Sequence, residues 1–146
     1  MSNIDRELIH RQLEELRDYR QKLDEFYVLD RETFLGDHHR YGLAEHYLQH
    51  AIEATLDVCR HLGLALGLKT TDDAHELLRQ LAGKGVLTKD FAESNAPMVG
   101  FRNVLVHEYA TVDHAKVYEY LHEHIRDFDE FIRQVSQYLV GQEKQA

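Results

Sequence analysis

Proline, cysteine and tryptophan are scarce in this sequence of 146 residues, which has one proline, one cysteine and no tryptophan. Because proline interrupts helices, its scarcity leaves room for long ones. A content of 43% hydrophobic and 29% charged residues fits a folded helical protein. The lone Cys59 excludes an internal disulfide and a cysteine-rich zinc site, and it agrees with a reducing compartment. We expect Cys59 to be a small core residue.

Long apolar runs are missing as well. No stretch approaches the roughly 18 apolar residues that a membrane-spanning helix needs. The first residues, Met1 to Glu7, are polar and acidic, unlike the basic start and apolar core of a secretory signal. The sequence therefore predicts a cytoplasmic protein with no membrane contact.

Positive charge is in short supply, since 17 Lys and Arg stand against 26 Asp and Glu, for a formal net charge of −9. A protein that coats nucleic acid relies on basic residues that displace counterions, so this composition argues against that class. A nuclease is not excluded, because an enzyme needs positive potential only within its cleft. An acidic exterior also complements a basic protein partner.

Apolar residues recur at steps of three and four along most of the chain, which indicates amphipathic helices. No stretch alternates as a strand does. The sequence predicts an all-α bundle of about five helices, forming one domain over residues 1–141 with a polar tail at 142–146. We expect helices from Ser2 or Asn3 to about Phe26, from Tyr41 to about Leu62, from Thr71 or Asp72 to Gly83, from Lys89 to Asn95, from Pro97 through residue 107, and from Asp113 to Leu139, with a short helical turn within 30–36.

One stretch concentrates polar chemistry, Arg102-Asn103-Val104-Leu105-Val106-His107-Glu108-Tyr109. An arginine for negative charge and a histidine for proton transfer suit the transition state of a phosphodiester. On a helix, Arg102 and Tyr109 fall on one stripe, while Asn103 and His107 fall on the neighbouring stripe. The apolar residues left to anchor the segment are Phe101, Val104 and Leu105.

The spacing R-N-x-x-x-H-x-Y, preceded by Met98-Val99-Gly100-Phe101, resembles the signature of the HepT-like toxins of the HEPN superfamily. These are all-helical ribonucleases paired with a minimal nucleotidyltransferase antitoxin. Residues 47–54 look like the family's long second helix, and the segments 85–87 and 91–92 look like its lead-in to the motif. The resemblance covers roughly residues 1–140 and implies a HEPN-type helical bundle.

The resemblance implies metal-independent endonucleolytic cleavage of messenger or transfer RNA, without a cofactor. Arg102 is then expected to stabilise charge on the phosphorane, and His107 to act as general acid or base. Asn103 is expected to hold a phosphate oxygen or the ribose. The 2′-hydroxyl of the RNA serves as nucleophile, which gives a cyclic phosphate and a 5′-hydroxyl. In this family the motif of a second protomer completes the cleft, so a homodimer is expected.

The resemblance also assigns Tyr109 as the residue that the antitoxin modifies, by transferring adenylyl groups from ATP to its hydroxyl. Each added nucleotide places a negative phosphate beside Arg102 and His107, which blocks RNA by occupancy and repulsion. The alternative is a HEPN domain without nuclease activity, a nucleotide-binding or interaction module that partners a nucleotidyltransferase. The intact Arg102, Asn103 and His107 weigh against that alternative.

Three other interpretations remain open from spacing alone, one for the motif and two for histidines and carboxylates elsewhere in the chain. Arg102 could be a surface arginine paired with Glu108 or another carboxylate, with His107 capping its helix. A stripe on the long helix has the spacing of a divalent-metal site, with His46, His50, Glu53 and Asp57. Two E-x-x-H pairs have the local spacing of a carboxylate-bridged dimetal bundle, Glu7 with His10 and Glu119 with His122.

Overall fold

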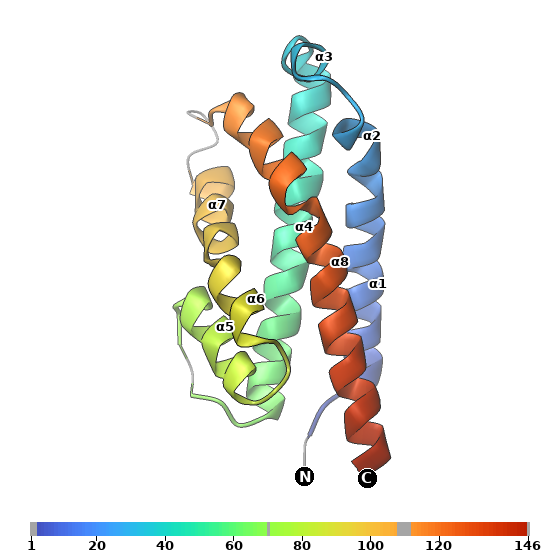
Figure 1. Ribbon diagram of the computed structural model, residues 1–146, viewed down its shortest axis with the longest axis vertical. Coiled ribbons are helices and arrows are strands. Elements are labelled where there is room, and N and C mark those ends of the chain that lie inside the picture. Colours follow the sequence, from blue (N-terminus) through green and yellow to red (C-terminus); the bar gives the residue numbers. More distant parts are fainter. Residues whose placement is uncertain (1–2, 70, 108–111, 146) are drawn as a thin grey trace.

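The chain is described by a computed structural model that covers residues 3–69, 71–107 and 112–145. Within those ranges every regular element is a helix and there is no strand, which confirms the predicted all-α fold class (Figure 1). Five helices have ten residues or more, and three short ones join them. In chain order they are α1 (Arg6–Lys22), α2 (Asp24–Tyr27), α3 (Arg31–Leu35), α4 (His38–Ala65), α5 (Ala74–Gly83), α6 (Lys89–Ser94), α7 (Ala96–His107) and α8 (His114–Gln145).

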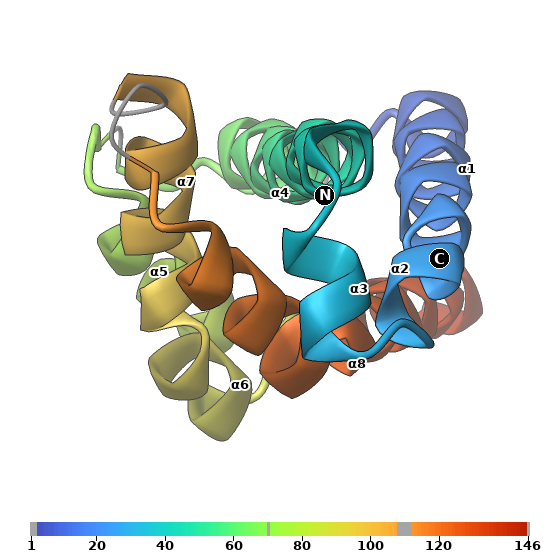
Figure 2. The ribbon, with the colours of Figure 1, turned by 90° about the horizontal axis from the view of Figure 1, so that it is seen from above.

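The long helix α4 lies at the centre of the bundle. It packs against α1 and α8 on one side and against α5 and α7 on the other, as the view along the bundle shows (Figure 2). Helices α5 and α6 carry the chain back so that α7 runs beside α4 in the opposite direction (Figure 1). This arrangement presents the motif helix to one flank of α4. None of the helices in the described ranges is both long and apolar enough to cross a bilayer.

Short polar side chains begin the helices, although several lie one to three residues away from the predicted cap. Asp5 caps α1 by accepting a hydrogen bond from the backbone N–H of Leu8 (3.1 Å), where the sequence predicts Ser2 or Asn3. Asp37 caps α4, which therefore begins at His38 and not at Tyr41. Each carboxylate satisfies amides that the first helical turn leaves without a partner.

The first and last helices differ from the prediction in extent. The expected single helix to Phe26 is interrupted at the buried Leu23, after which α2 begins. The last helix does not stop at Gly141 but continues through the polar tail to Gln145. One glycine costs a helix only about 1 kcal/mol. Arg6 ties this end to α1, since its Nη1 donates to the carbonyl of Leu139 (2.8 Å).

A single core runs through the bundle, and α4 supplies two apolar stripes to it. In the second stripe, which the spacing of Ile52, Cys59 and Leu66 predicts, Ile52 and Cys59 are fully buried by the chain's own helices and Leu66 is partly buried. Burial raises the pKa of the Cys59 thiol to about 12, so the cysteine is a core residue as predicted. The largest fully buried side chains are Phe34, Phe128 and Phe131.

We expect two glycine substitutions to change stability in opposite directions. Gly85 has a φ of +79°, a conformation that costs an L-residue roughly 1–2 kcal/mol, so Gly85→Ala should lower the free energy of unfolding by that amount. Gly42 lies within helix α4, so Gly42→Ala should raise it by roughly 0.5–1 kcal/mol. At neither position does an added Cβ meet an atom within 4 Å, which removes clashes as a cause. Urea denaturation measures the free energy of unfolding of both variants. A change in the same direction for Gly85→Ala and Gly42→Ala would contradict the backbone explanation.

Candidate functional site

The motif helix α7 begins where the prediction places it. Pro97 lies in its first turn, where the missing N–H costs no helical hydrogen bond. Asn95 precedes the helix and is buried, with its side-chain nitrogen donating to the carbonyl of Phe91 (3.0 Å). The buried Asn95 thus closes the end of α6 at the corner where the motif helix begins.

Apolar residues of α7 anchor it, as the sequence predicts, and one of their partners lies on α8. The ring of Phe101 stacks on that of Tyr120, with centroids 4.2 Å apart and an interplanar angle of 4°. Leu105 is buried in the same core. Because residues three and four apart share a face, these contacts direct Arg102 away from α8 and toward α4.

Arg102 is held by two side chains. Its Nε donates to Glu53 Oε1 of α4 (2.6 Å), and its Nη1 donates to Asn103 Oδ1 (3.1 Å). The Arg102 side chain is 29% exposed and that of Glu53 31%, so the ion pair is only partly shielded from solvent. The guanidinium group is therefore oriented but still within reach of a ligand. The carboxylate partner of Arg102 is a residue of α4, distant in sequence.

The predicted metal-binding stripe on α4 is used differently in the structure. Glu53 pairs with Arg102, and Asp57 pairs with Arg60 (2.7 Å). His50 Nδ1 is hydrogen-bonded to the backbone carbonyl of its own helix at His46 (2.9 Å). Across the described ranges, the one group of three side chains with metal-ligand spacing is Asp37-His38-His39, at the solvent-exposed start of α4. In the described structure the ligand atoms of His46, His50, Glu53 and Asp57 are therefore not gathered at one point.

The dimetal hypothesis is wrong. His122 uses both ring nitrogens on backbone carbonyls, those of Tyr118 and Tyr27, each at 2.8 Å. The other three side chains point to solvent and cannot meet inside the bundle, namely Glu7, His10 and Glu119.

Part of the predicted site lies outside the described residues. The backbone of His107 ends helix α7, but its side chain is not described. Glu108 and Tyr109 also lie outside the described ranges. The roles predicted for His107 and Tyr109 therefore stay predictions, whereas Arg102 and Asn103 are placed side by side.

A family comparison decides what this helical bundle is. The family described as "Ribonuclease HepT-like" matches residues 8–135 of the chain. The chain belongs to this family. The match spans most of the helical bundle, from α1 into the last part of α8, and confirms the resemblance inferred from the motif.

The named relatives of this HepT-like chain are nucleases. It is 27% identical over 145 residues to "tRNA nuclease HepT" of Aphanizomenon flos-aquae, covering 99% of both chains. It is 28% identical over 85 residues to "mRNA nuclease HepT" of Shewanella oneidensis, covering 58% of this chain and 64% of that one. The two names give different RNA substrates, so relatedness alone does not select one.

A solved structure shows the same fold. It is the tri-AMPylated HEPN toxin of Shewanella oneidensis in complex with MNT antitoxin, with a TM-score of 0.78 and 22% identity. The alignment covers 94% of this chain and 99% of that toxin. At this level of identity the likeness establishes the helical fold alone.

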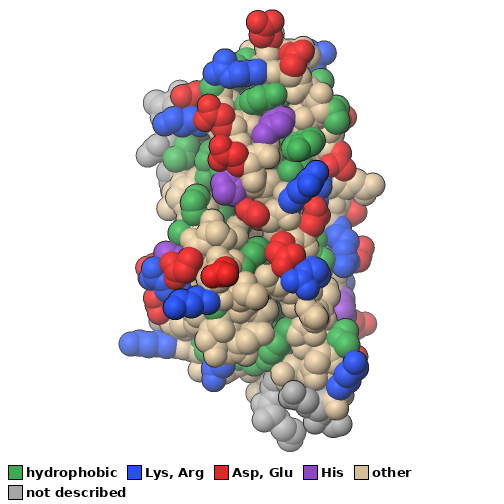
Figure 3. All heavy atoms as spheres, viewed as in Figure 1, with side chains coloured by type: hydrophobic (Ala, Val, Ile, Leu, Met, Phe, Trp, Pro, Cys, Tyr) green, Lys and Arg blue, Asp and Glu red, His purple; other side chains and the backbone are tan. Residues whose placement is uncertain are grey.

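Charge on the HepT-like surface is mixed. On the face seen in Figure 3, carboxylates and basic side chains are interspersed over the surface and do not form one continuous basic band. This agrees with the net charge of −9. On this face, positive potential is therefore confined to local groups.

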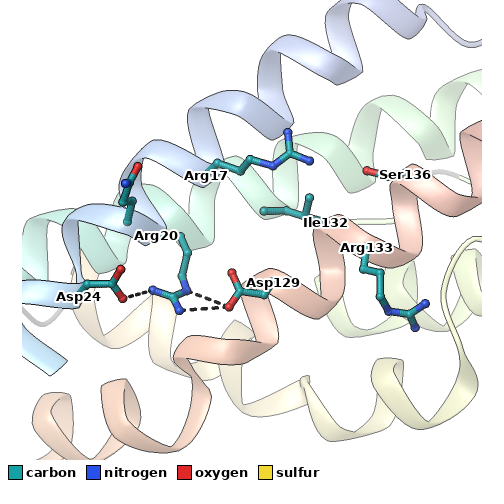
Figure 4. Close-up of a pocket in the computed structure, with 8 residues that line it drawn as sticks. Arg17, Arg20, Asp24, Asp129, Ile132, Arg133 and Ser136 are labelled. Carbon is teal, nitrogen blue, oxygen red and sulfur yellow. Dashed lines mark hydrogen bonds and ion pairs between the residues drawn. The ribbon is translucent and has the colours of Figure 1, made fainter. Parts of the chain in front are cut away.

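Three arginines line a groove between α1 and α8, a hollow of about 530 Å³ (Figure 4). They are Arg17, Arg20 and Arg133. Each of these arginines has a carboxylate partner. Arg20 bridges Asp24 of α2 (2.5 Å) and Asp129 of α8 (3.1 Å), and Arg133 pairs with Glu130. Their charge is compensated within the bundle, so we assign this groove to holding the two helices together.

A second pair of polar side chains links α4 to the start of α8. Glu45 Oε2 accepts a hydrogen bond from His114 Nδ1 (2.8 Å), and the imidazole stacks on Tyr41 with centroids 3.9 Å apart. Burial raises the pKa of Glu45, while the contact with His114 opposes that shift. The sequence motif gave no sign of this pair or of the contact between Glu53 and Arg102.

Proposed function

We propose that this HepT-like chain is the RNA-cleaving toxin of a toxin–antitoxin pair, acting as a metal-independent endoribonuclease. The observation that carries the proposal is the placement of Arg102. It is oriented by Glu53 and Asn103 and remains partly exposed, on the same helix that ends in His107. The names of the two curated relatives support a nuclease.

The chemistry needs a charge stabiliser and a proton carrier. Arg102 neutralises the charge that develops on the phosphorane, and Asn103 contacts a phosphate oxygen or the ribose. His107 moves a proton as the 2′-hydroxyl attacks phosphorus, which yields a cyclic phosphate and a 5′-hydroxyl. The chain's own side chains supply these functions, so the proposed reaction proceeds in EDTA.

RNA end analysis tests this function directly. The purified protein should cleave RNA in EDTA and leave 2′,3′-cyclic phosphate ends. Sequencing the RNA ends after brief induction in cells then identifies messenger or transfer RNA as the substrate. A protein that leaves all RNA intact would favour the non-catalytic interaction module instead.

Glu53 acts as a positioning residue for Arg102 in this proposal. We expect Glu53→Ala to lower kcat about 10-fold while KM stays the same or falls, because the guanidinium loses its orientation but also its competing anion. Glu53→Gln keeps an acceptor and should lose less. Steady-state cleavage of a labelled oligonucleotide separates the two constants.

The matched control is Asp57→Ala, one turn further along the same stripe of α4. Its partner is Arg60 and not a motif residue, so its activity should stay within about twofold of wild type. If Asp57→Ala loses as much activity as Glu53→Ala, a general effect on α4 explains both.

The proposed enzyme is a homodimer in which two motif helices share one cleft. One motif supplies few catalytic groups, and a two-fold axis doubles them. Helix α4 carries Leu43 and Leu64 on its outward side, 41% and 71% exposed, which provides apolar contacts for a second copy. Light scattering at micromolar concentration should give twice the mass of the chain. A strictly monomeric active enzyme would refute the shared cleft.

Control by an MNT-type nucleotidyltransferase completes the proposal. The related toxin from Shewanella oneidensis is described as tri-AMPylated and in complex with MNT antitoxin. By analogy, the antitoxin adenylylates Tyr109 of this chain. The attached phosphate and base then occupy the space that RNA needs beside Arg102.

A further inference from the structure

Four rings gather on the outer side of α4, close to the contact that holds Arg102. The ring centroids of His46 and His50 lie 4.2 Å apart, and that of His50 lies 5.2 Å from that of Tyr19 on α1. Tyr47 joins them, with its centroid 5.7 Å from His46 and 6.5 Å from Tyr19. None of these four side chains is buried, and His46 is exposed. We call them the ring cluster.

One ridge of α4 connects the ring cluster to the motif. His46, His50 and Glu53 follow one another at steps of four and three residues, which places them on one face of the helix. Glu53 holds Arg102 of α7 through the 2.6 Å contact. Helix α4 lies between α7 and α1, so the ridge reaches from the motif helix to Tyr19 (Figure 2). A ligand at Arg102 that crosses α4 meets the rings within roughly 5–10 Å along the helix.

The charges beside the ring cluster suit a polyanion. The exposed Lys22 of α1 places its Nζ 5.6 Å from the ring centroid of Tyr19 and 5.5 Å from that of Tyr47. The two carboxylates of the ridge, Glu53 and Asp57, are each paired with an arginine. A cation among flat rings is the combination with which proteins hold single-stranded nucleic acid, because rings take bases and the cation takes a phosphate.

Contacts within the protein hold the rings in place without a ligand. His50 Nδ1 donates to the backbone carbonyl of His46 (2.9 Å). The ring of Tyr47 lies against that of the buried Phe26, with centroids 6.3 Å apart. Side chains that are already ordered lose little conformational freedom on binding, which favours affinity.

The ring cluster is compatible with the proposed homodimer. The exposed Leu43 and Leu64, which provide apolar contacts for a second copy, lie toward opposite ends of α4. They are roughly 30 Å apart along the helix. The ridge between them is polar, so the two leucines leave its middle to a polar ligand.

We propose that the ring cluster is a binding subsite for single-stranded RNA, on which bases next to the cleaved bond stack while Lys22 contacts a phosphate. This inference rests on the proposed ribonuclease function and deepens it, since it specifies the form of RNA that the site accepts. Paired bases stack on one another and are not free to stack on a protein ring. The substrate is therefore cleaved in an unpaired segment.

The test measures binding separately from cleavage, by fluorescence anisotropy of the full-length protein with a labelled single-stranded 2′-O-methyl RNA. This oligonucleotide lacks the nucleophilic hydroxyl and stays intact. We expect His46→Ala/His50→Ala to raise Kd about 10-fold or more, because stacking is lost while alanine keeps the helix. His46→Phe/His50→Phe retains two rings and should bind within about threefold of wild type.

The matched control is His38→Ala/His39→Ala. These two histidines are exposed in the first turn of the same helix, with ring centroids 4.1 Å apart. Their removal should leave Kd within about twofold of wild type. An abasic nucleotide at the stacked position should weaken binding to wild type but not weaken binding to His46→Ala/His50→Ala further, because the two changes remove the same contact.

Each outcome decides the proposal. If His46→Ala/His50→Ala binds within about twofold of wild type and both cleave RNA, the subsite fails and the ribonuclease function stands. If wild type binds the single strand through these rings but cleaves no RNA, the subsite stands and the ribonuclease function fails. If the phenylalanine variant binds as weakly as the alanine variant, stacking is not the interaction and the subsite fails. If the alanine variant is monomeric in light scattering where wild type is dimeric, the ridge is a contact between copies.

Discussion

Arg102→Ala and His107→Ala should each lower kcat/KM for RNA cleavage by on the order of 100-fold or more, with the fold retained. For Arg102 the expected loss follows from its fixed orientation, since its guanidinium is held by Glu53 and Asn103 where charge is to be neutralised. For His107 it follows from the proton that must move. The measurement is the rate of cleavage in EDTA, with circular dichroism to confirm that each variant is folded.

Arg60→Ala is the matched control for Arg102→Ala. Arg60 also pairs with a carboxylate on α4, but it comes from the same helix and is exposed. Its loss should leave cleavage within about twofold of wild type. Full cleavage by both Arg102→Ala and His107→Ala would move the active site elsewhere. Cleavage that stops in EDTA would contradict the metal-independent reaction.

Tyr109→Phe should abolish modification by the antitoxin while RNA cleavage persists. The proposed acceptor is the phenol oxygen, and phenylalanine lacks it. Incubation with the active nucleotidyltransferase and ATP, followed by intact mass measurement, should show whole adenylate increments on wild type and none on Tyr109→Phe. The unmodified variant should then escape silencing by the active partner.

The control for this experiment is Tyr138→Phe. Tyr138 lies near the end of α8, far along the chain from the motif, and its loss should leave the adenylate increments unchanged. If Tyr109→Phe is silenced as fully as wild type, complex formation alone inhibits the toxin. If the increments persist on Tyr109→Phe, another side chain is the acceptor.

The helices were predictable because their determinants are local. Periodic apolar residues identified every long helix, and the side chains of Asp30, Thr88 and Asp113 accept the hydrogen bonds that begin three of the helices. The errors lie at the ends of helices. Asp5 and Asp37 could each be assigned either to a cap or to a neighbouring position, and only the hydrogen bond to a given amide decides between them.

The motif was predictable for the same reason, since its groups lie within consecutive residues. The partners of those groups were not. Periodicity places Glu53 on a stripe of α4 but does not say which helix lies opposite, so a stripe with His46 and His50 resembled a metal site. In the structure α7 lies opposite, and Glu53 meets Arg102. Glu45 and His114 are 69 residues apart, and no local pattern links them.

The ion pair between Arg102 and Glu53 means that the arginine of the motif already has an internal counter-ion. When an arginine without a counter-ion neutralises a phosphate of a nucleic acid, the nucleic acid releases condensed counterions, and such binding weakens as salt rises. Here an incoming phosphate exchanges with a carboxylate of the protein itself, so this contact should respond less to ionic strength. A mononucleotide gains little from such an exchange, whereas a longer RNA can drive it with contacts elsewhere. Glu53 should thereby weaken the binding of mononucleotides and other small anions at Arg102 more than it weakens the binding of RNA.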